Sequence, residues 1–309
     1  MDKRDSSLHR RLQVFLSIVE IKTKVISVVT FASAVLFSIH YAEGISLLLF
    51  ILMTLAVLLV DMGTTAFNNY FDFRSGVDVP EFSKDRDKIL MLGDTSAFTA
   101  LHIAVVLFLA AVIVGLVITF LVGLWVAAAG AVSMAVGYLY NGGPHPISRT
   151  PFGELFAGGF LGGVLFLISV YVFTGGISTA AVFAAIPPTL LVGGVLLVNN
   201  TCDMVGDEAA GRRTLPLLVG KTAGELGVYA AGAAAYAVLL HSVRAGYLPE
   251  TVIYGAVPAA AITFYTYLRM HRRGYNHDTK VDNMKAIVGL YGLYGIMFTG
   301  TLGADVLFR

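Results

Sequence analysis

Charged residues are scarce in this sequence. Asp, Glu, Lys and Arg make up 13% of its 309 residues, whereas a typical soluble domain carries about 25%. Apolar residues make up 57% of the chain, and the mean hydropathy is +0.78. A soluble protein of this length needs more charge to cover its surface, so the composition predicts a membrane protein with several spans. The net charge of +1 says nothing about partners.

Cysteine is almost absent as well. Cys202 is the only cysteine of the chain, which excludes an intrachain disulfide and a metal site built from several cysteines. We expect Cys202 to be a small buried packing residue.

Long apolar runs are abundant. A membrane-spanning helix needs about 20 mostly apolar residues, and runs of this length are too continuous for the tilted strands of a membrane barrel. We therefore expect an all-α membrane protein with nine transmembrane helices, forming a single domain over residues 1–309. The expected spans are residues 25–41, 46–70, 97–115, 118–140, 153–174, 179–201, 222–242, 249–268 and 284–306. Residues 1–24 are basic and then apolar, without a small-residue cleavage site, which predicts a retained interfacial helix.

Lysine and arginine are distributed unevenly between the ends of these spans. If nine helices alternate in direction, nineteen of the 21 Lys and Arg residues lie on the side of the N-terminus, and only Arg244 and Arg309 lie on the other. Cytoplasmic loops of membrane proteins are rich in these residues. We therefore expect a cytoplasmic N-terminus and an external C-terminus, whereas eight spans would scatter the charges.

Two similar polar segments end apolar runs. The first motif reads FNNYFDFRSGVD at residues 67–78, and the second reads VNNTCDMVGD at residues 198–207. Both contain Asn-Asn-x-x-Asp followed by a further aspartate, and both fall at the cytoplasmic end of an expected helix. Carboxylates at membrane depth are costly and normally have a partner, so two copies of the pattern need a common physical reason.

Clustered Asp and Asn oxygens suit a hard divalent cation. Magnesium usually binds one or two carboxylates, keeps several waters and takes other ligands from phosphates. Residues four apart share one face of a helix, so the oxygens within each motif can act together. The candidate metal ligands are Asn68, Asp72 and Asp78 in the first motif and Asn199, Asp203 and Asp207 in the second. Two such half-sites facing each other would hold two magnesium ions around one diphosphate.

Basic residues in the adjoining loops could complete a diphosphate site. The candidate substrate-binding residues here are Lys24, Lys88, Arg212 and Arg213, together with the second asparagine of each motif, Asn69 and Asn200. The other reading is that the motifs are helix-end residues facing water, or polar contacts between helices. Two copies on one membrane side, each near basic residues, favour the metal site.

These motifs resemble the two aspartate-rich motifs of the UbiA superfamily of intramembrane prenyltransferases, and in particular its 1,4-dihydroxy-2-naphthoate branch in menaquinone biosynthesis. Three further stretches are similar in the same order: KILMLGDTS at 88–96, GYLYNGGPHPISRTPFGEL at 137–155 and GRRTLPLLVGKTAG at 211–224. The resemblance covers most of the chain, and five motifs in the right order are a specific signal.

The resemblance implies a nine-helix bundle with a central cavity open to the cytoplasm. It implies that magnesium and basic groups stabilise departing diphosphate, so that an allylic polyprenyl diphosphate ionises and an aromatic acceptor attacks in a dry cavity. The residues implied in catalysis are Asp72, Asp203, Tyr138 and Tyr140, the tyrosines by stabilising a carbocation or orienting the acceptor. Arg149 is the candidate contact for the acceptor's carboxylate.

The chain departs from the family pattern in two places. Asn69 stands where the first motif often has an aspartate, and the next acid is Asp78 because position 76 is Gly76. The first half-site would then bind its metal with fewer carboxylates. The first span also reads IKTKVIS where many relatives have Arg-Pro, which leaves Lys24 as the basic residue there.

Two alternatives stay open. The acceptor could be 4-hydroxybenzoate, another quinol precursor or a lipid. The chain could instead be a cation-coupled transporter, although transporter sites lie near mid-bilayer and these acids gather at one face beside basic loops. Nothing in the sequence supports a nucleic-acid partner.

Four further features of the sequence are not among the candidate site residues. Asp61 could hydrogen-bond within the bundle or reach the site, and His145 is expected to be an unengaged loop residue. GGFLGG at 158–163 predicts close helix packing. Residues 267–285 are expected to form mostly a cytoplasmic connector held by anionic lipid, with Asp282 and Asn283 opening the last helix.

Overall fold

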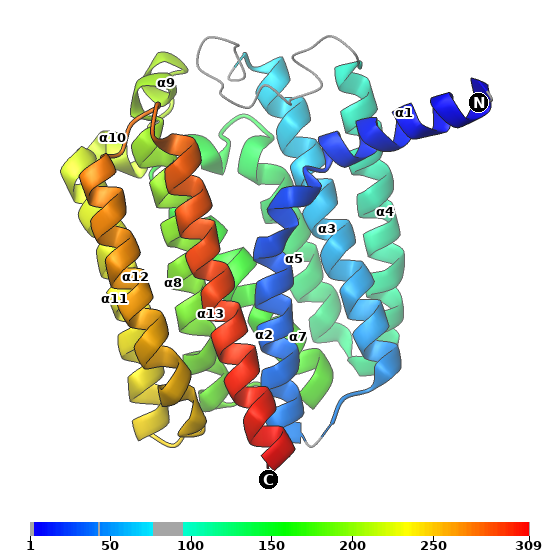
Figure 1. The fold of residues 1–309 in the computed structure, drawn as a ribbon. Helices are drawn as coiled ribbons and strands as arrows, with labels where there is room; N and C mark the ends of the chain where they lie inside the picture. Colours follow the sequence, from blue (N-terminus) through cyan, green and yellow to red (C-terminus); the bar gives the residue numbers. More distant parts are fainter. Residues whose placement is uncertain (1–2, 43, 77–94, 309) are drawn as a thin grey trace.

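The computed structural model describes residues 3–42, 44–76 and 95–308, and every regular element within them is a helix. The elements, in chain order, are α1 (Lys3–Ile18), η1 (Ile21–Lys24), α2 (Val25–Ala42), α3 (Leu47–Arg74), α4 (Ala97–Val122), α5 (Leu124–Asn141), η2 (Ile147–Arg149), α6 (Gly153–Ala157), η3 (Gly158–Val164), α7 (Leu165–Thr174), α8 (Thr179–Cys202), α9 (Met204–Ala209), α10 (Leu215–Val219), α11 (Lys221–Arg244), α12 (Thr251–Arg273) and α13 (Lys280–Phe308). Figure 1 shows the long helices side by side, running up and down.

Nine helical segments within the described residues are long and apolar enough to cross a membrane, as the apolar runs predict. The boundary between the third and fourth spans differs clearly from the expectation. Residues 97–115 were expected to form one span and residues 118–140 the next, but α4 continues to Val122 and the break comes at Gly123. Gly123 has φ 142°, a conformation that favours glycine. The helix therefore ends where glycine permits a turn of the backbone, although the apolar run itself continues.

The expected connector over residues 267–285 is mostly helical, which corrects that expectation. α12 continues to Arg273, where Gly274 ends it with φ 79°, and α13 begins at Lys280. Histidine and arginine in the last turn of α12 suit a helix C-terminus because they complement its dipole. Most basic residues of this stretch therefore lie in the last turn of α12 and the first turns of α13. The connector between the two helices consists of residues 274–279 only.

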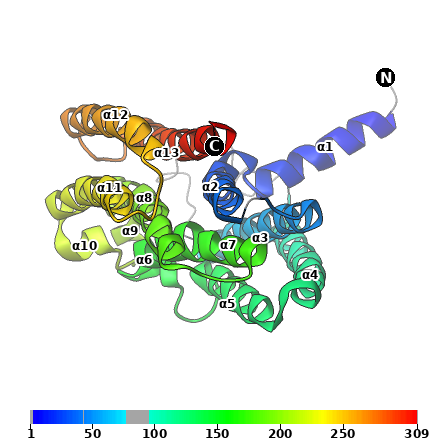
Figure 2. The same ribbon diagram turned by 90° about the horizontal axis from the view of Figure 1, so that it is seen from below.

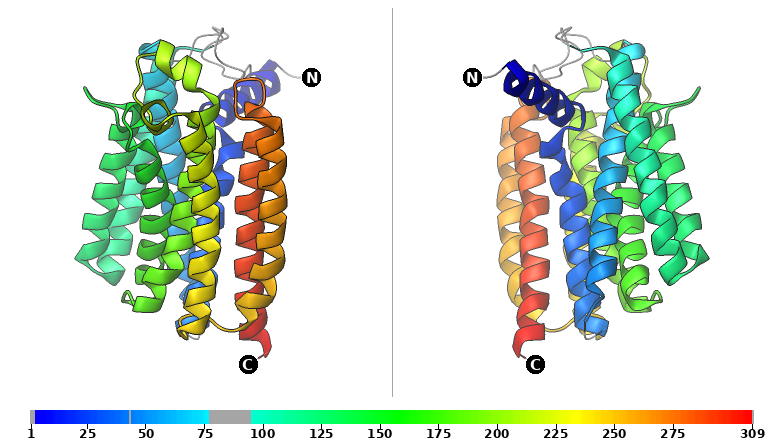
Figure 3. Two further views of the ribbon diagram at one scale, coloured as in Figure 1. Left: turned by 90° about the vertical axis from the view of Figure 1, so that its left-hand side faces the viewer. Right: turned by 90° about the vertical axis from the view of Figure 1, so that its right-hand side faces the viewer.

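The helices form a ring when seen along their axes (Figure 2). α3 packs against α4 and α5, α8 packs against α11 and η3, and α13 packs against α12 and α2. The contact between α13 and α2 joins the last span to the first. The two side views of Figure 3 place the C-terminus at one end of the bundle and α1 at the other.

The expected close packing at residues 158–163 is present. η3 is a turn of π-helix between α6 and α7, and it lies against α8. Methyl groups placed on Gly158 and Gly162 would come within 2.4 Å of the backbone oxygens of Thr189 and Pro188. Only glycine allows so close an approach of two backbones.

The second motif does not form one unbroken helix. α8 ends at Cys202, and α9 begins at Met204 after Asp203, whose φ of −99° and ψ of 8° lie outside helical geometry. The amide of Asp203 still donates to the oxygen of Asn199, and the amide of Asp207 donates to the oxygen of Asp203. The four-residue spacing is thus kept across the break.

Candidate active site

A cavity of about 810 Å³ lies between the helices. Its wall follows α3 from Met53 to Asp72, and at about 1.5 Å per residue this is a length of roughly 29 Å. One end of the cavity is lined by charged and amide side chains, and most of the remaining wall is apolar. We call this charged end the polar end. Its lining includes Asn68, Asp72, Asn199, Asp203, Asp207, Arg212 and Lys280.

The first motif enters the polar end from the last turns of α3. Asp72 accepts a hydrogen bond from the side chain of Asn141 at 2.8 Å, and its other carboxylate oxygen lies 4.0 Å from Arg212. The Oδ1 atom of Asn68 is buried without a hydrogen-bond partner. Asn69 lines the cavity too, but its amide donates to the backbone oxygen of Ile18 at 2.8 Å, which ties α1 to α3.

The second motif enters from the end of α8 and from α9. Asp203 forms an ion pair with Lys280 at the start of α13. Asp207 is buried, and its Oδ1 accepts a hydrogen bond from Arg212 at 3.0 Å while Thr214 donates to its Oδ2. The break at Asp203 therefore leaves both aspartates of the motif on the cavity wall.

Arg212 links the two motifs. Its guanidinium contacts Asp207 at 3.0 Å and lies 4.0 Å from Asp72. Burial lowers the pKa of Arg212, but the carboxylates of Asp207 and Asp72 outweigh burial, so the net pKa is raised. Burial also raises the pKa of Asp207, and Arg212 offsets only part of that effect. Two carboxylates around one buried guanidinium form a compact charged cluster.

A second polar group lies deeper in the cavity. Lys24 is buried, and its ammonium forms an ion pair with Asp61 at 2.7 Å and donates to Thr65. Ser27 donates to the other carboxylate oxygen of Asp61. All four side chains line the cavity. Asp61 therefore both hydrogen-bonds within the bundle and reaches the cavity, which answers the question that its position raised.

Comparison with known proteins identifies the family. Residues 27–287 match the model of the UbiA prenyltransferase family. The chain belongs to this family. The match covers most of the chain, and it agrees with the family that the five sequence motifs indicate.

Curated relatives within the UbiA family include two naphthoate enzymes. The chain is 39% identical over 176 residues to 1,4-dihydroxy-2-naphthoate octaprenyltransferase of Bacillus subtilis, and this region is 57% of the chain and 56% of that protein. The enzyme of the same name from Mycobacterium tuberculosis is 33% identical over 106 residues, 34% of the chain and 36% of that protein. The similarity thus spans about half or less of the length of these relatives.

Solved structures of UbiA homologues have the same fold. A homologue from Archaeoglobus fulgidus, described as bound to GPP and Mg2+, matches with a TM-score of 0.69 at 14% identity, covering 95% of this chain and 99% of that one. A homologue from Aeropyrum pernix K1 matches with a TM-score of 0.68 at 20% identity, covering 92% and 98%. At these identities the likeness concerns the fold.

The UbiA-family cavity of this chain contains most of the site residues expected from the sequence. The cavity lining includes Lys24, Asn68, Asn69, Asp72, Tyr140, Asn199, Asn200, Asp203, Asp207 and Arg212. Asp78 and Lys88 lie outside the described residues. The two motifs, far apart in sequence, thus share one cavity.

Three of the expected site residues do not line the cavity. Tyr138 is 39% exposed and packs edge-on against Phe67 and Phe71. Tyr140 follows it by two residues, which is about 200° around a helix, so only one of the two tyrosines can face inward. Arg213 is exposed, and its amide donates to the oxygen of Arg149. This backbone contact joins η2 to the segment after α9, and neither arginine lines the cavity. His145 is exposed.

Three site residues escaped the sequence analysis. Asn141 holds Asp72, Lys280 holds Asp203, and the buried Glu154 accepts a hydrogen bond from Asn200 at 2.8 Å. Asn141 and Glu154 are polar residues at the ends of apolar runs, as Asn68 and Asn199 are, and that signal could have indicated them. Lys280 carries no such signal because it belongs to a basic stretch.

The polar end fits a magnesium ion that is shared with a phosphate ligand. No group of three or more His, Cys, Asp or Glu side chains that could hold a metal alone occurs among the described residues. Magnesium commonly uses one or two carboxylates and completes its shell with water and phosphate oxygens. The Oδ1 atoms of Asn68 and Asp203 are buried without hydrogen-bond partners, so these oxygens can serve as ligands.

Proposed function

We propose that this protein transfers a polyprenyl group from an allylic prenyl diphosphate to 1,4-dihydroxy-2-naphthoate, giving a demethylmenaquinol-type product. The observation that carries the proposal is the division of one cavity into a polar end and a long apolar part. A prenyl diphosphate is divided in the same way, with a charged head and an apolar tail. The polar end suits its diphosphate, and the apolar part suits its isoprenoid units.

The described residues can act on the diphosphate in two ways. Magnesium, when bound to the carboxylates of the polar end, supplies positive charge that stabilises the leaving group. We assign Asn68, Asp72, Asn199, Asp203 and Asp207 as its ligands, with two ions expected, and Asp78 is proposed with them. Arg212 adds a fixed positive charge in a buried position, where electrostatic stabilisation is stronger than in water.

The walls of the cavity protect the reaction from water. Ionisation of an allylic diphosphate gives a carbocation, which water would quench, so apolar surroundings are required. Tyr140 lines the cavity beside the polar end, where its ring can stabilise the cation. We place the aromatic acceptor near Tyr140, where the electron-rich ring carbon that bears the carboxylate attacks the carbocation. The C–O bond of the donor breaks with release of diphosphate, the new C–C bond forms, and the carboxylate leaves as CO2, which restores the aromatic ring.

Named relatives support the donor, the metal and the acceptor. Two A. fulgidus homologue structures are described as bound to Mg2+ with DMAPP or with GPP, both short prenyl diphosphates. The B. subtilis and M. tuberculosis relatives are named for the naphthoate acceptor. These names support an allylic prenyl diphosphate as donor and the naphthoate as acceptor.

The membrane arrangement is part of the proposal. We propose that residues 1–309 form one integral membrane domain whose polar end faces the cytoplasm, with a cytoplasmic N-terminus and an external C-terminus. The side of the polar end also carries most Lys and Arg residues, as cytoplasmic faces do. Helix α1 then lies at the cytoplasmic interface, where basic amphipathic segments bind, whereas Ile21–Lys24 already belong to the first candidate span.

The acceptor is the point on which relatives differ. A relative from Methanobrevibacter smithii, 29% identical over 177 residues, is named digeranylgeranylglyceryl phosphate synthase. Its name indicates a glyceryl lipid acceptor, so a lipid is the main competing acceptor. A cation-coupled transporter is not favoured because Asp72, Asp203 and Asp207 gather at one end of the cavity, whereas transporter sites lie near mid-bilayer. The deeper Asp61 is paired with Lys24.

A competition assay tests the proposal. Purified protein receives magnesium, geranylgeranyl diphosphate and three acceptors together: 1,4-dihydroxy-2-naphthoate, 4-hydroxybenzoate and a geranylgeranylglyceryl phosphate. We expect a prenylated, decarboxylated naphthoquinol by mass spectrometry, and we expect EDTA to abolish it and excess magnesium to restore it. A product from another acceptor would refute the naphthoate assignment, and magnesium-independent turnover would refute the metal site.

A further inference from the structure

The short connector between α12 and α13 has a well-defined conformation. The side chain of Asn276 accepts hydrogen bonds from the amides of Asp278 and Thr279 at 2.9 and 3.1 Å. Asn283, fully buried in the first turn of α13, donates to the oxygen of Gly274 at 2.9 Å and accepts from Arg273 at 3.1 Å. These bonds fix the start of α13, so the backbone of Lys280 has a defined position.

The residue that follows this connector, Lys280, lies at the polar end of the cavity. Lys280 lines the cavity and forms an ion pair with Asp203, although the two residues are 77 positions apart in sequence. Its side chain is 22% exposed, so it can change partner at a small desolvation cost. Arg212, a second cation of the polar end, comes from the segment after α9 and contacts Asp207 and Asp72. The two cations hold different carboxylates.

We propose that Lys280 is a diphosphate-binding residue that exchanges its partner, contacting Asp203 in the empty protein and a phosphate oxygen when magnesium and diphosphate are bound. This inference rests on the proposed function and adds a residue to its substrate site. It gives the basic stretch over residues 267–285 a role at the cavity, where the sequence indicated only a connector.

The exchange follows from competition for one carboxylate. Lys280 and a magnesium ion need the same negative charge on Asp203, so an ion that binds there displaces the ammonium. Lysine has a compact charge on a flexible four-carbon stem, and the closest new anion is the phosphate that arrives with the metal. Lys280 therefore disfavours magnesium alone and favours magnesium together with diphosphate. Thermodynamic linkage makes this coupling reciprocal between the two ligands.

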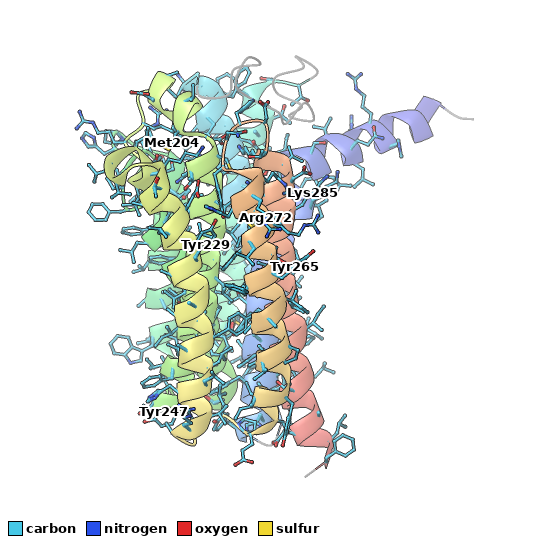
Figure 4. The ribbon with its side chains drawn as sticks, turned by 60° about the vertical axis from the view of Figure 1, so that its left-hand side comes forward. Met204, Tyr229, Tyr247, Tyr265, Arg272 and Lys285 are labelled. Atoms are coloured by element: carbon cyan, nitrogen blue, oxygen red, sulfur yellow. The ribbon has the colours of Figure 1, made fainter. Side chains whose placement is uncertain are left out.

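The test measures binding and needs no acceptor. Full-length protein in detergent is titrated by calorimetry with Mg2+ alone, and then with inorganic diphosphate at saturating Mg2+. The main variant is Lys280→Gln, because glutamine can still donate a hydrogen bond to Asp203 and so protects the fold. Lys285→Gln is the matched control, since Lys285 is an exposed lysine on the same helix at the same end of the molecule (Figure 4).

We expect Lys280→Gln to weaken diphosphate binding by about 10- to 100-fold, the range of a charge-assisted hydrogen bond. The same change should strengthen binding of Mg2+ alone by several-fold, because the competing ammonium is gone. Lys280→Arg should recover most of the diphosphate affinity, and Lys285→Gln should match the wild type in both titrations.

Three results would overturn the inference, and the third would overturn the proposed function as well. Equal diphosphate affinity in Lys280→Gln and Lys285→Gln would show that Lys280 does not bind the anion. Tighter binding of both ligands by Lys280→Gln would show that the lysine only competes with the metal. If the wild type bound no diphosphate with Mg2+, the proposed function would fail together with this inference. Because no acceptor is present, a wrong acceptor assignment would leave the titrations unchanged.

Discussion

Single side chains at the polar end explain how so much charge is tolerated between apolar helices. A buried charge is costly unless a partner of opposite charge and hydrogen bonds compensate it. Arg212 contacts Asp207 and Asp72, and Lys280 contacts Asp203. Asp72, Asp203 and Asp207 are therefore held in place by cations, and this part of the site is preorganised to receive a ligand.

Asp207 gives a test of this arrangement at the scale of one residue. Asp207→Asn removes a buried negative charge that both Arg212 and a metal would use, while keeping a similar shape. We expect kcat/KM for the prenyl diphosphate to fall by about 100-fold or more, and the magnesium requirement to rise, because metal-site partners typically contribute factors of this size. Steady-state kinetics over a range of magnesium concentrations provide the measurement.

Glu208 supplies a matched control for that prediction. It is the next residue of α9, but it is exposed and does not line the cavity. Glu208→Gln should change kcat/KM by less than about twofold, as surface substitutions away from such features usually do. If Asp207→Asn kept the activity of Glu208→Gln, Asp207 would have no role at the site.

The sequence predicts some residues of the cavity well and others poorly. The sequence could pair Asn68 with Asp72 because a spacing of four residues places them on one helix face. The spans that carry the two motifs run in the same direction, so both motifs were expected at the same end of the bundle. Tyr138 and Tyr140 could not be separated, because the sequence does not say which side of the helix faces the cavity. Lys280 could not be found, since its contact with Asp203 depends on how α13 packs against α8.

At the scale of elements, the packing of η3 on α8 shapes one wall of the cavity. Phe160 and Leu161 of η3 line it, as do Val192 and Leu196 of α8. The glycines predicted the close approach, because small residues let helices pack tightly in membranes. The π-helical turn itself could not be predicted from the sequence, because it forms where η3 packs against the backbone of α8.

Glycine substitutions test this packing. A methyl group on Gly162 would lie 2.4 Å from the backbone oxygen of Pro188, and a backbone atom cannot move aside cheaply. We expect Gly162→Ala to lower the free energy of unfolding by about 1–3 kcal/mol, the usual cost of overpacking. Thermal unfolding in detergent, followed by circular dichroism, measures the change.

Gly159 is the matched control on the same element. A methyl group there would meet nothing within 4 Å, and alanine has a higher helix propensity than glycine. Gly159→Ala should therefore leave the unfolding temperature equal or slightly higher. Equal losses of stability in both variants would mean that the loss comes from the helix conformation and not from the contact with α8.

At the scale of the whole molecule, the number of spans determines which ends share a membrane side. If all nine candidate spans of the described residues cross the membrane, their odd number puts Lys3 and Phe308 on opposite sides, as we propose. The number was predictable because each apolar run reaches the minimum of about 17 residues that a membrane span needs, and the uneven distribution of Lys and Arg supports it. The exact helix ends were less predictable, as Gly123 shows, because composition does not change there.

The direction of the bundle in the membrane can be measured with single cysteines. Cys202 is buried, and Cys202→Ser provides a background without it. In that background, Glu208→Cys places a thiol at the polar end, and Glu250→Cys places one before α12 at the other end. Both glutamates are exposed, so a membrane-impermeant maleimide can reach either position from its own side.

Intact cells should label Glu250→Cys and leave Glu208→Cys unmodified until the membrane is permeabilised. This result follows because the face that carries most Lys and Arg stays in the cytoplasm, and Glu208 lies on that face with the polar end. The reverse pattern would place the polar end outside the cell and would contradict the proposed orientation. Labelling of both positions in intact cells would mean that the chain inserts in two directions, which the strong charge asymmetry argues against.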